Sequence, residues 1–154
     1  MEKSYGQNIP KKEIIQAKPK IISNFPNIYD YIFGMILQNW DIAKNLILSI
    51  DRDFIIDKYL ELYDCITLFI DSENINEIFE NLDEANQEIF QDILMQKIQI
   101  DKNTSYEEHI LKNIPLLIRL KYREISEKLK LEPDNNELVY LLNKLASKIS
   151  GKTI

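Results

Sequence analysis

The sequence predicts an all-α protein, and three observations lead to that prediction. The 154 residues include only three Gly and five Pro, so few positions interrupt a helix. Apolar residues recur at intervals of three and four, which is the spacing of one helix face. Hydrophobic residues make up 45% and charged residues 29%, as in a soluble globular protein, and a chain of this length can bury roughly 70% of its unfolded surface.

Three parts are expected along the chain. Residues 1–24 mix Lys, Gln, Asn and Pro without a sustained period, and we interpret them as a flexible linker or arm. Residues 25–103 are expected to form a helical bundle. Residues 104–154 are expected to form a long kinked helix and a C-terminal helical hairpin.

The first helix is expected to begin near Ser23 or Asn24, either of which can cap it, with Pro26 in its first turn. From there to Asn39 apolar residues cover nearly every side, which predicts a helix at the centre of the bundle. A narrow polar strip remains, made of Asp30, Gly34 and Gln38. Gly34 marks either the solvent side or a close approach by a neighbouring backbone, and the sequence leaves both open.

Four further helices are expected in the bundle. A short one follows in "DIAKNLILSI" (41–50), and the most regular one spans about 55–70. Two shorter ones, marked by apolar residues at 75–82 and 89–98, end at "DKNTS". Residues 51–92 contain thirteen Asp or Glu against two Lys or Arg, which predicts an acidic surface.

A long helix is expected to open the second half. Ser105 and Glu108 have the spacing of a capping box, and an apolar stripe then runs for more than five turns. The stripe consists of Leu111, Ile114, Ile118, Tyr122, Ile125 and Leu129. Pro115 lies within it, so a kink or a break is expected near Asn113. Residues 112–130 carry six Lys or Arg against two Glu.

The last helix completes a hairpin after the turn "EPDN". Asp134 and Glu137 offer a second capping box, and Gly151 is expected to end the helix. Its apolar face, towards the preceding helix, is made of Leu138, Leu142, Leu145 and Ile149.

The other side of this last helix is the predicted protein contact. It carries Tyr140 and Lys144, with Lys148 at its margin, and an aromatic residue between lysines suits a protein interface. A lone exposed Tyr without a role is the alternative. The predicted partner-binding residues are Tyr140, Leu141, Lys144, Lys148 and Lys130.

No catalytic, cofactor-binding or metal-ligating residue is predicted, so the chain is expected not to be an enzyme. Asp51 and Asp53 have a spacing that can hold Mg²⁺, but helix capping explains them better. His109, the sole histidine, is expected to be solvated or to cap, and Cys65 to be a core thiol. Neither a Gly-rich phosphate loop nor a Ser/His/Asp set occurs in the sequence.

The overall charge and the termini indicate the kind of partner and the compartment. A formal net charge of −6 argues against strong binding of nucleic acid by this domain alone, so protein partners are expected. A single cysteine excludes an internal disulfide. The sequence contains no signal-peptide pattern and no membrane-length apolar run, and a cytoplasmic location is expected.

The order of these segments is similar to that of a known family. "YIFGMILQNWDIAKNLI", "IDRDFIIDKYLELYDCITLFI", short acidic helices, "NIPLLIRLKYREISEKLK" and a closing hairpin together resemble the C-terminal helicase-binding domain of bacterial DnaG-type primases, over about residues 27–150. The "hP-E-L" segment of that family is replaced here by "NWDIAKNL". The zinc-binding and polymerase domains of a primase are not part of this sequence, and the resemblance implies that they would attach through residues 1–24.

The resemblance implies that the hairpin docks on the N-terminal collar of the hexameric DnaB-type replicative helicase and recruits primer synthesis to the fork. The related N-terminal domain of that helicase shares much of the same helix order and is one alternative. A free-standing helical regulator from a phage or virus that binds a host protein is another. A third is a nucleic-acid-binding arm that uses Lys112 through Lys130.

Overall fold

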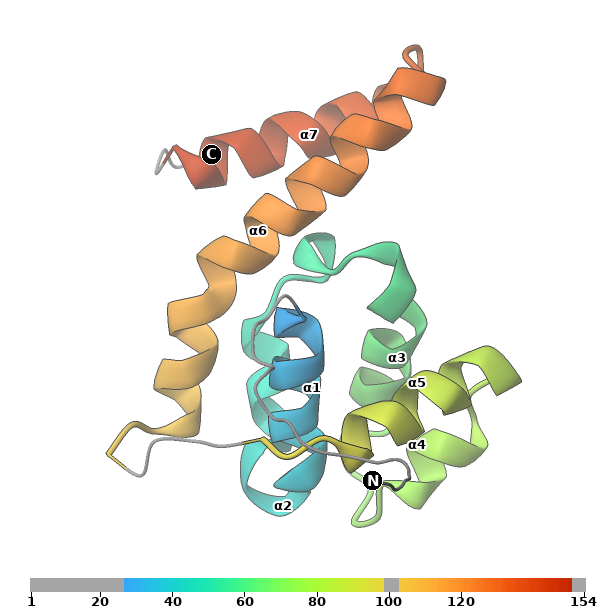
Figure 1. Ribbon diagram of the computed structural model, residues 1–154, viewed down its shortest axis with the longest axis vertical. Coiled ribbons are helices and arrows are strands. Elements are labelled where there is room, and N and C mark those ends of the chain that lie inside the picture. Colours follow the sequence, from blue (N-terminus) through green and yellow to red (C-terminus); the bar gives the residue numbers. More distant parts are fainter. Residues whose placement is uncertain (1–26, 99–102, 151–154) are drawn as a thin grey trace, which may run out of the picture.

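The computed structural model describes residues 27–98 and 103–150, and every regular element in these two ranges is a helix (Figure 1). The all-α prediction is confirmed. Four predictions lie outside these ranges, namely those of the arm, the cap at Ser23 or Asn24, the place of Pro26 and the role of Gly151. No helix within them is both long and apolar enough to cross a membrane.

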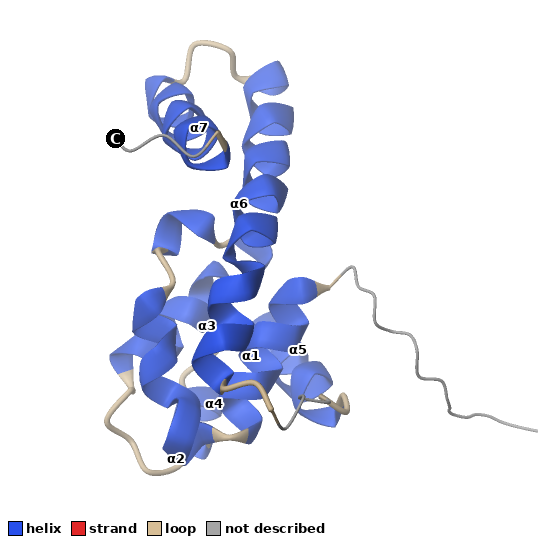
Figure 2. Ribbon diagram, turned by 90° about the vertical axis from the view of Figure 1, so that its left-hand side faces the viewer, coloured by secondary structure: helices blue, strands red, loops and turns tan. Residues whose placement is uncertain are grey.

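The elements follow one another in two spatial groups. They are α1 (Ile28–Gln38), α2 (Trp40–Ala43), the 3₁₀ helices η3 (Lys44–Ser49) and η4 (Arg52–Phe54), α3 (Asp57–Leu68), α4 (Asn76–Glu80), α5 (Glu84–Met95), α6 (Tyr106–Leu131) and α7 (Asn136–Ile149). Figure 2 shows α1 to α5 gathered at one end of the molecule, while the far half of α6 and the whole of α7 stand beyond them. The predicted second helix is thus a short α-helix continued by a 3₁₀ helix.

Helix α1 lies at the centre of the bundle, as its apolar wrapping predicts. Seven of its eleven residues are buried, and it contacts α2, η3, α5 and α6. The ring of Tyr59 in α3 stacks on two aromatic rings of α1, those of Tyr29 and Phe33, with centroids 5.2 and 5.6 Å away. The Tyr59 hydroxyl donates a 2.7 Å hydrogen bond to Asp30 Oδ1, so the polar end of this buried ring also has a partner.

The polar strip of α1 runs beside the end of α5. Gln38 Nε2 donates to the carbonyl of Gln96 over 2.8 Å, and Gln96 Nε2 donates back to Asp30 Oδ2 over 2.9 Å. Between these contacts a Cβ on Gly34 would lie 3.0 Å from Ile98 Cγ1. The strip therefore satisfies backbone carbonyls at the C-terminal end of α5. Gly34 is buried, and side chains rather than a backbone approach it closely.

Helix α6 is continuous over 26 residues, and its capping box of Ser105 and Glu108 is confirmed. Pro115 does not break it, although it has no N–H to donate to the carbonyl of Leu111. Figure 1 shows the axis changing direction in the lower part of the helix, so of the two predicted outcomes the structure has the kink. The Asn113 side chain donates to the carbonyl of His109 over 2.7 Å just before the proline.

The buried face of α6 is rotated relative to the predicted stripe. Leu111, expected in the stripe, is 53% exposed. The buried residues are His109, Ile110, Leu117, Ile118, Lys121 and Ile125. The sequence stripe was wrong at its start because the bend at Pro115 shifts the first turns relative to the rest of the helix.

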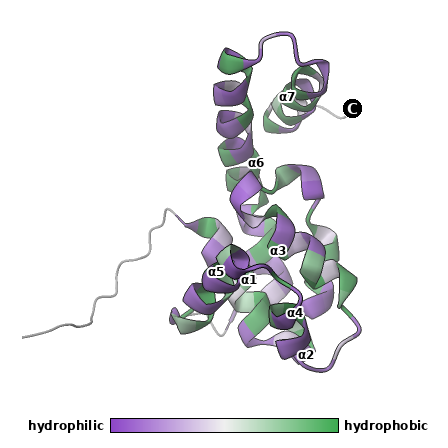
Figure 3. Cartoon of the chain, turned by 90° about the vertical axis from the view of Figure 1, so that its right-hand side faces the viewer, coloured by the Kyte–Doolittle hydropathy of each residue, from purple (hydrophilic) through white to green (hydrophobic). Residues whose placement is uncertain are grey.

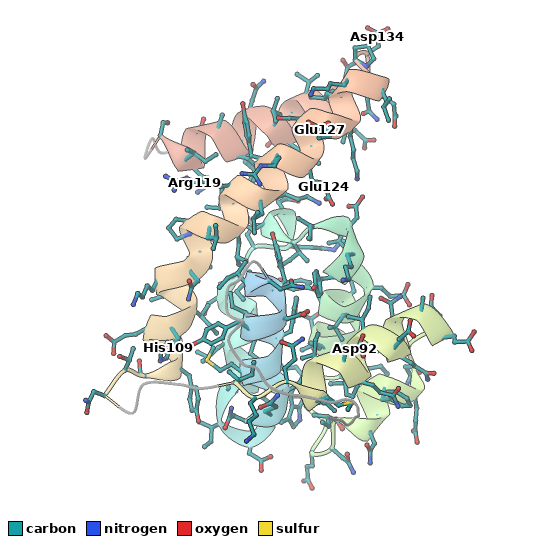
Figure 4. The ribbon with its side chains drawn as sticks, in the orientation of Figure 1. Asp92, His109, Arg119, Glu124, Glu127 and Asp134 are labelled. Atoms are coloured by element: carbon teal, nitrogen blue, oxygen red, sulfur yellow. The ribbon has the colours of Figure 1, made fainter. Side chains whose placement is uncertain are left out.

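A cluster of charges joins α6 to the start of α3. Lys121 is only 3% exposed, and its ammonium lies 3.3 Å from Asp57 Oδ1 and 3.2 Å from Glu124 Oε2. Glu124, which lies on the side of α6 towards α3 in Figure 4, also accepts the backbone N–H of Asp57 over 3.0 Å. Lys128 forms a second ion pair with Asp57. A buried ammonium with two carboxylate partners holds the two helices in one register.

Replacing Gly34 by Val should destabilise the bundle by about 1–3 kcal/mol, because the added methyl groups overlap Ile98 in a closely packed site. Urea unfolding followed by far-ultraviolet circular dichroism measures the change. Ala85→Val, at an exposed position of α5, is the control for β-branching in a helix. Equal losses of unfolding free energy in the two variants would contradict the close approach at Gly34.

Asp57→Asn should lower stability by about 1–2 kcal/mol at pH 7, since Lys121 keeps only Glu124 and the lost pairs are half-exposed. Burial alone would raise the pKa of the Asp57 carboxyl, but Lys128 and Lys121 outweigh it and hold the pKa below its ordinary value. The stabilisation is therefore present above the unfolded-state pKa of about 3.9 and is lost as the pH falls through the lowered folded-state value.

Urea unfolding of both proteins between pH 7 and pH 2 tests this dependence on Asp57. The difference in unfolding free energy should be constant above about pH 5 and should vanish at the acid end. Asp92→Asn, on the exposed side of α5, is the matched control and should follow the wild type at every pH. A difference that persists unchanged at pH 2 would contradict the proposed charge pairing.

Candidate protein-docking surface

Helix α7 folds back along α6, and the two form the outer hairpin of the molecule (Figures 1 and 2). Its N-cap is Asn135, and the prediction of Asp134 was wrong by one residue. Asn135 Oδ1 accepts the backbone N–H groups of Glu137 and Leu138 over 3.1 and 3.2 Å. Asp134 lies at the tip of the hairpin in Figure 4, inside the turn, so Asn135 is the last residue with extended backbone before the helix.

The apolar face of α7 packs as predicted near its middle. Leu145 is fully buried and Leu138 and Leu142 are half-buried, whereas Ile149 at the end of the helix is exposed. Hydrophobic and hydrophilic residues alternate along both helices of the hairpin in Figure 3. Tyr140 points away from this face and is 71% exposed. The structure thus leaves a large aromatic side chain on the outside of the hairpin.

Lys144, one of the predicted partner contacts, lies against the bundle. Its ammonium is 3.1 Å from Asp51 Oδ2 and 2.6 Å from Asp53 Oδ2. The hydrogen bond to Asp53 raises the pKa of Lys144. Asp51 also caps η4 by accepting the backbone N–H of Asp53 over 2.9 Å, as the capping interpretation predicts. The two carboxylates therefore already share a cation from the chain itself.

The other predicted contact residues differ in their surroundings. Lys130, near the end of α6, pairs with Glu127 over 3.0 Å, and both side chains are exposed. Leu141 is half-buried beside Tyr140. Lys148 is exposed and forms no ion pair with the residues that the structure describes. Tyr140, Leu141 and Lys148 thus remain available for a contact on this side of α7, whereas Lys144, one turn after Tyr140, is paired with the bundle.

A pocket lies where α7 overhangs η4, with a volume of about 410 Å³. Asp53 lines it from η4, and the α7 side of its lining is Asn136, Glu137, Tyr140 and Leu141. We call it the α7–η4 pocket. Sequence reasoning missed Asp53 and Glu137 as parts of this surface. No local signal could have found them, since Lys144 and Asp53, which join the two elements, are 91 residues apart.

A larger groove of about 520 Å³ runs between α6 and the starts of α1 and α3. Its lining is mostly apolar, with Tyr29, Ile56 and Leu120 among its residues, and Glu124 and Lys128 of the ion cluster at its side. This groove therefore coincides with the joint between bundle and hairpin.

The candidate reactive side chains lie inside the protein. The expectation of a solvated His109 was wrong: it is 9% exposed, and its Nδ1 lies 3.2 Å from the Tyr31 hydroxyl. The rotated face of α6 explains this burial. Cys65 is buried as predicted, and burial raises the pKa of its thiol. Among the described residues, no three His, Cys, Asp or Glu side chains are placed to hold a metal ion.

Lys144→Met should lower the unfolding free energy by about 1 kcal/mol, because it removes two partly exposed ion pairs and keeps the length of the side chain. Hydrogen exchange should also become faster in α7 than in α3, since the helix loses its contact with η4. Lys148→Met is the matched control and should change neither quantity. Identical exchange in α7 for both variants would show that Lys144 does not hold the hairpin on the bundle.

Comparison of the chain with protein-family models, with curated proteins and with solved structures found no match. The chemistry of this surface rests on three of its features. They are the exposed ring of Tyr140, the exposed Lys148, and a pocket between α7 and η4 that contains two carboxylates. An ion pair between Lys144 and Asp53 holds α7 against η4.

Proposed function

We propose that the chain is a non-catalytic interaction domain that binds a DnaB-type replicative helicase, through the N-terminal domain of that helicase. In this proposal the outward side of α7 makes the contact and the bundle lies beside the partner. The domain would then recruit the polymerase that it accompanies, and with it primer synthesis, to the replication fork.

The exposed ring of Tyr140 is the observation that carries the proposal. Helix α7 uses Leu145 and its half-buried neighbours against α6, so Tyr140 is not needed for the packing of the hairpin. Tyrosine is among the residues that contribute most to binding energy in protein interfaces. Leu141 provides apolar area beside the ring, and the exposed Lys148, about two turns further along α7, provides a charge at the margin of the surface.

The resemblance of the helix order to primase helicase-binding domains names the partner. An all-helical chain in which a long helix and a shorter one extend beyond a bundle is compatible with that family's docking element (Figure 2). The non-catalytic role is supported by the surroundings of the candidate reactive groups, which are either ion-paired within the chain or buried. Asp51 and Asp53 pair with Lys144, while Cys65 and His109 lie in the interior.

Tyr140→Ala should weaken binding to the isolated N-terminal domain of the replicative helicase about tenfold or more, which is the loss expected for a central aromatic contact. Isothermal titration calorimetry measures the dissociation constant. Far-ultraviolet circular dichroism should show unchanged helical content, since Tyr140 is largely solvent-exposed.

Leu68→Ala is the control for this measurement, because Leu68 is also a large exposed side chain, 76% accessible, but lies at the end of α3. Its affinity should equal that of the wild type. If the wild-type chain does not bind the helicase domain at all, the proposed partner is wrong. If the partner binds and both variants bind equally well, the contact lies elsewhere on the molecule.

A further inference from the structure

The α7–η4 pocket has carboxylates on two of its sides. Asp53 lines it from η4 and Glu137 from the first turn of α7. Lys144 contacts Asp53 through Oδ2 only, and a carboxylate has acceptor capacity on both oxygens. Asp51 and Asp53 share the single ammonium of Lys144, and Glu137 adds a third carboxylate, so the pocket and its base keep a negative charge.

The backbone of the pocket does not oppose this charge. The N-terminus of a helix attracts anions through its free N–H groups, but here the Asn135 side chain already accepts those of Glu137 and Leu138. No Lys or Arg lines the pocket. An anionic ligand would therefore meet two carboxylates and no free cation, whereas a cationic ligand would meet complementary charge.

The remaining lining suits the stem and the plane of a basic side chain. Leu141 provides an apolar contact for methylene groups, and the exposed ring of Tyr140 offers a face for a cation. A guanidinium group combines planar stacking with donors for two carboxylates. The pocket thus has the parts that an arginine side chain uses, and a lysine ammonium can use most of them.

We propose that the α7–η4 pocket receives a basic side chain, preferably an arginine, from the surface of the protein partner. The proposal defines the chemistry of the surface described under Proposed function and rests on that function for the identity of the partner. Lys144 acts in it as a positioning residue, because its ion pairs hold α7 over η4 and so bring Glu137 and Tyr140 to the same pocket as Asp53.

The pocket can be tested without the partner. In ¹H–¹⁵N spectra of the full chain, N-acetyl-arginine amide should produce saturable shifts of Tyr140, Leu141 and Glu137 resonances, with a dissociation constant on the order of 10 mM. N-acetyl-citrulline amide has nearly the same shape without the charge and should produce none. Equal shifts with the two compounds, or no shift with either, would overturn the proposal.

A variant separates the pocket from the rest of the surface. Glu137→Gln keeps the shape of the side chain, leaves the Asn135 cap intact and should weaken binding of the arginine amide roughly two- to fivefold. Glu88→Gln, at an exposed position of α5, is the control and should leave the shifts unchanged. Identical titrations for wild type and Glu137→Gln would exclude the pocket as the site of binding.

The same pair of variants, measured against the helicase N-terminal domain, distinguishes this inference from the proposed function. Binding of the helicase with equal affinity by Glu137→Gln and Glu88→Gln would support the function and reject the pocket. Selective binding of the arginine amide, without any binding of the helicase, would support the pocket and reject the named partner. A selective loss in both assays is the result that we expect.

Discussion

Helix α6 belongs to both halves of the molecule, and the rest of the arrangement depends on its continuity through Pro115. Its first half lies in the bundle, where Ile110 and Leu117 are buried against other elements, and its second half carries α7. A helix of 26 residues extends over about 39 Å, so a small rotation at its base moves its far end by several ångströms. The direction of the hairpin is therefore decided inside the bundle.

The middle of α6 is held by charges as well as by apolar packing. Burying a charge without a partner is far less favourable than burying an apolar group. The buried ammonium of Lys121 therefore has to keep its carboxylate partners. Its partners are Glu124 on the same helix and Asp57 at the start of α3. This requirement fixes the rotation of α6 about its own axis more tightly than interchangeable aliphatic contacts would.

The parts of the fold that follow from local spacing could be predicted from the sequence. The central position of α1, the start of α6 at Ser105 and the burial of Cys65 each depend on a few neighbouring residues. The contact of Lys144 with the bundle could not be predicted, because its partners Asp51 and Asp53 are more than 90 residues away in the sequence. Periodicity alone places a lysine on the solvent side of its helix. Only the tertiary structure shows that carboxylates lie next to this lysine.

The same long-range contact changes what the surface of α7 can recognise. Read from the sequence, Lys144 and Lys148 beside Tyr140 describe a basic surface that suits an acidic partner. In the folded chain Lys144 is neutralised by the acidic segment that begins at Asp51, and the pocket next to Tyr140 contains Asp53 and Glu137. Of the two lysines of α7, only Lys148 forms no ion pair with a described residue. Lys144 of α7 pairs with the acidic segment, so the surface around Tyr140 presents an aromatic ring next to carboxylates. The surface complementary to it is a basic one.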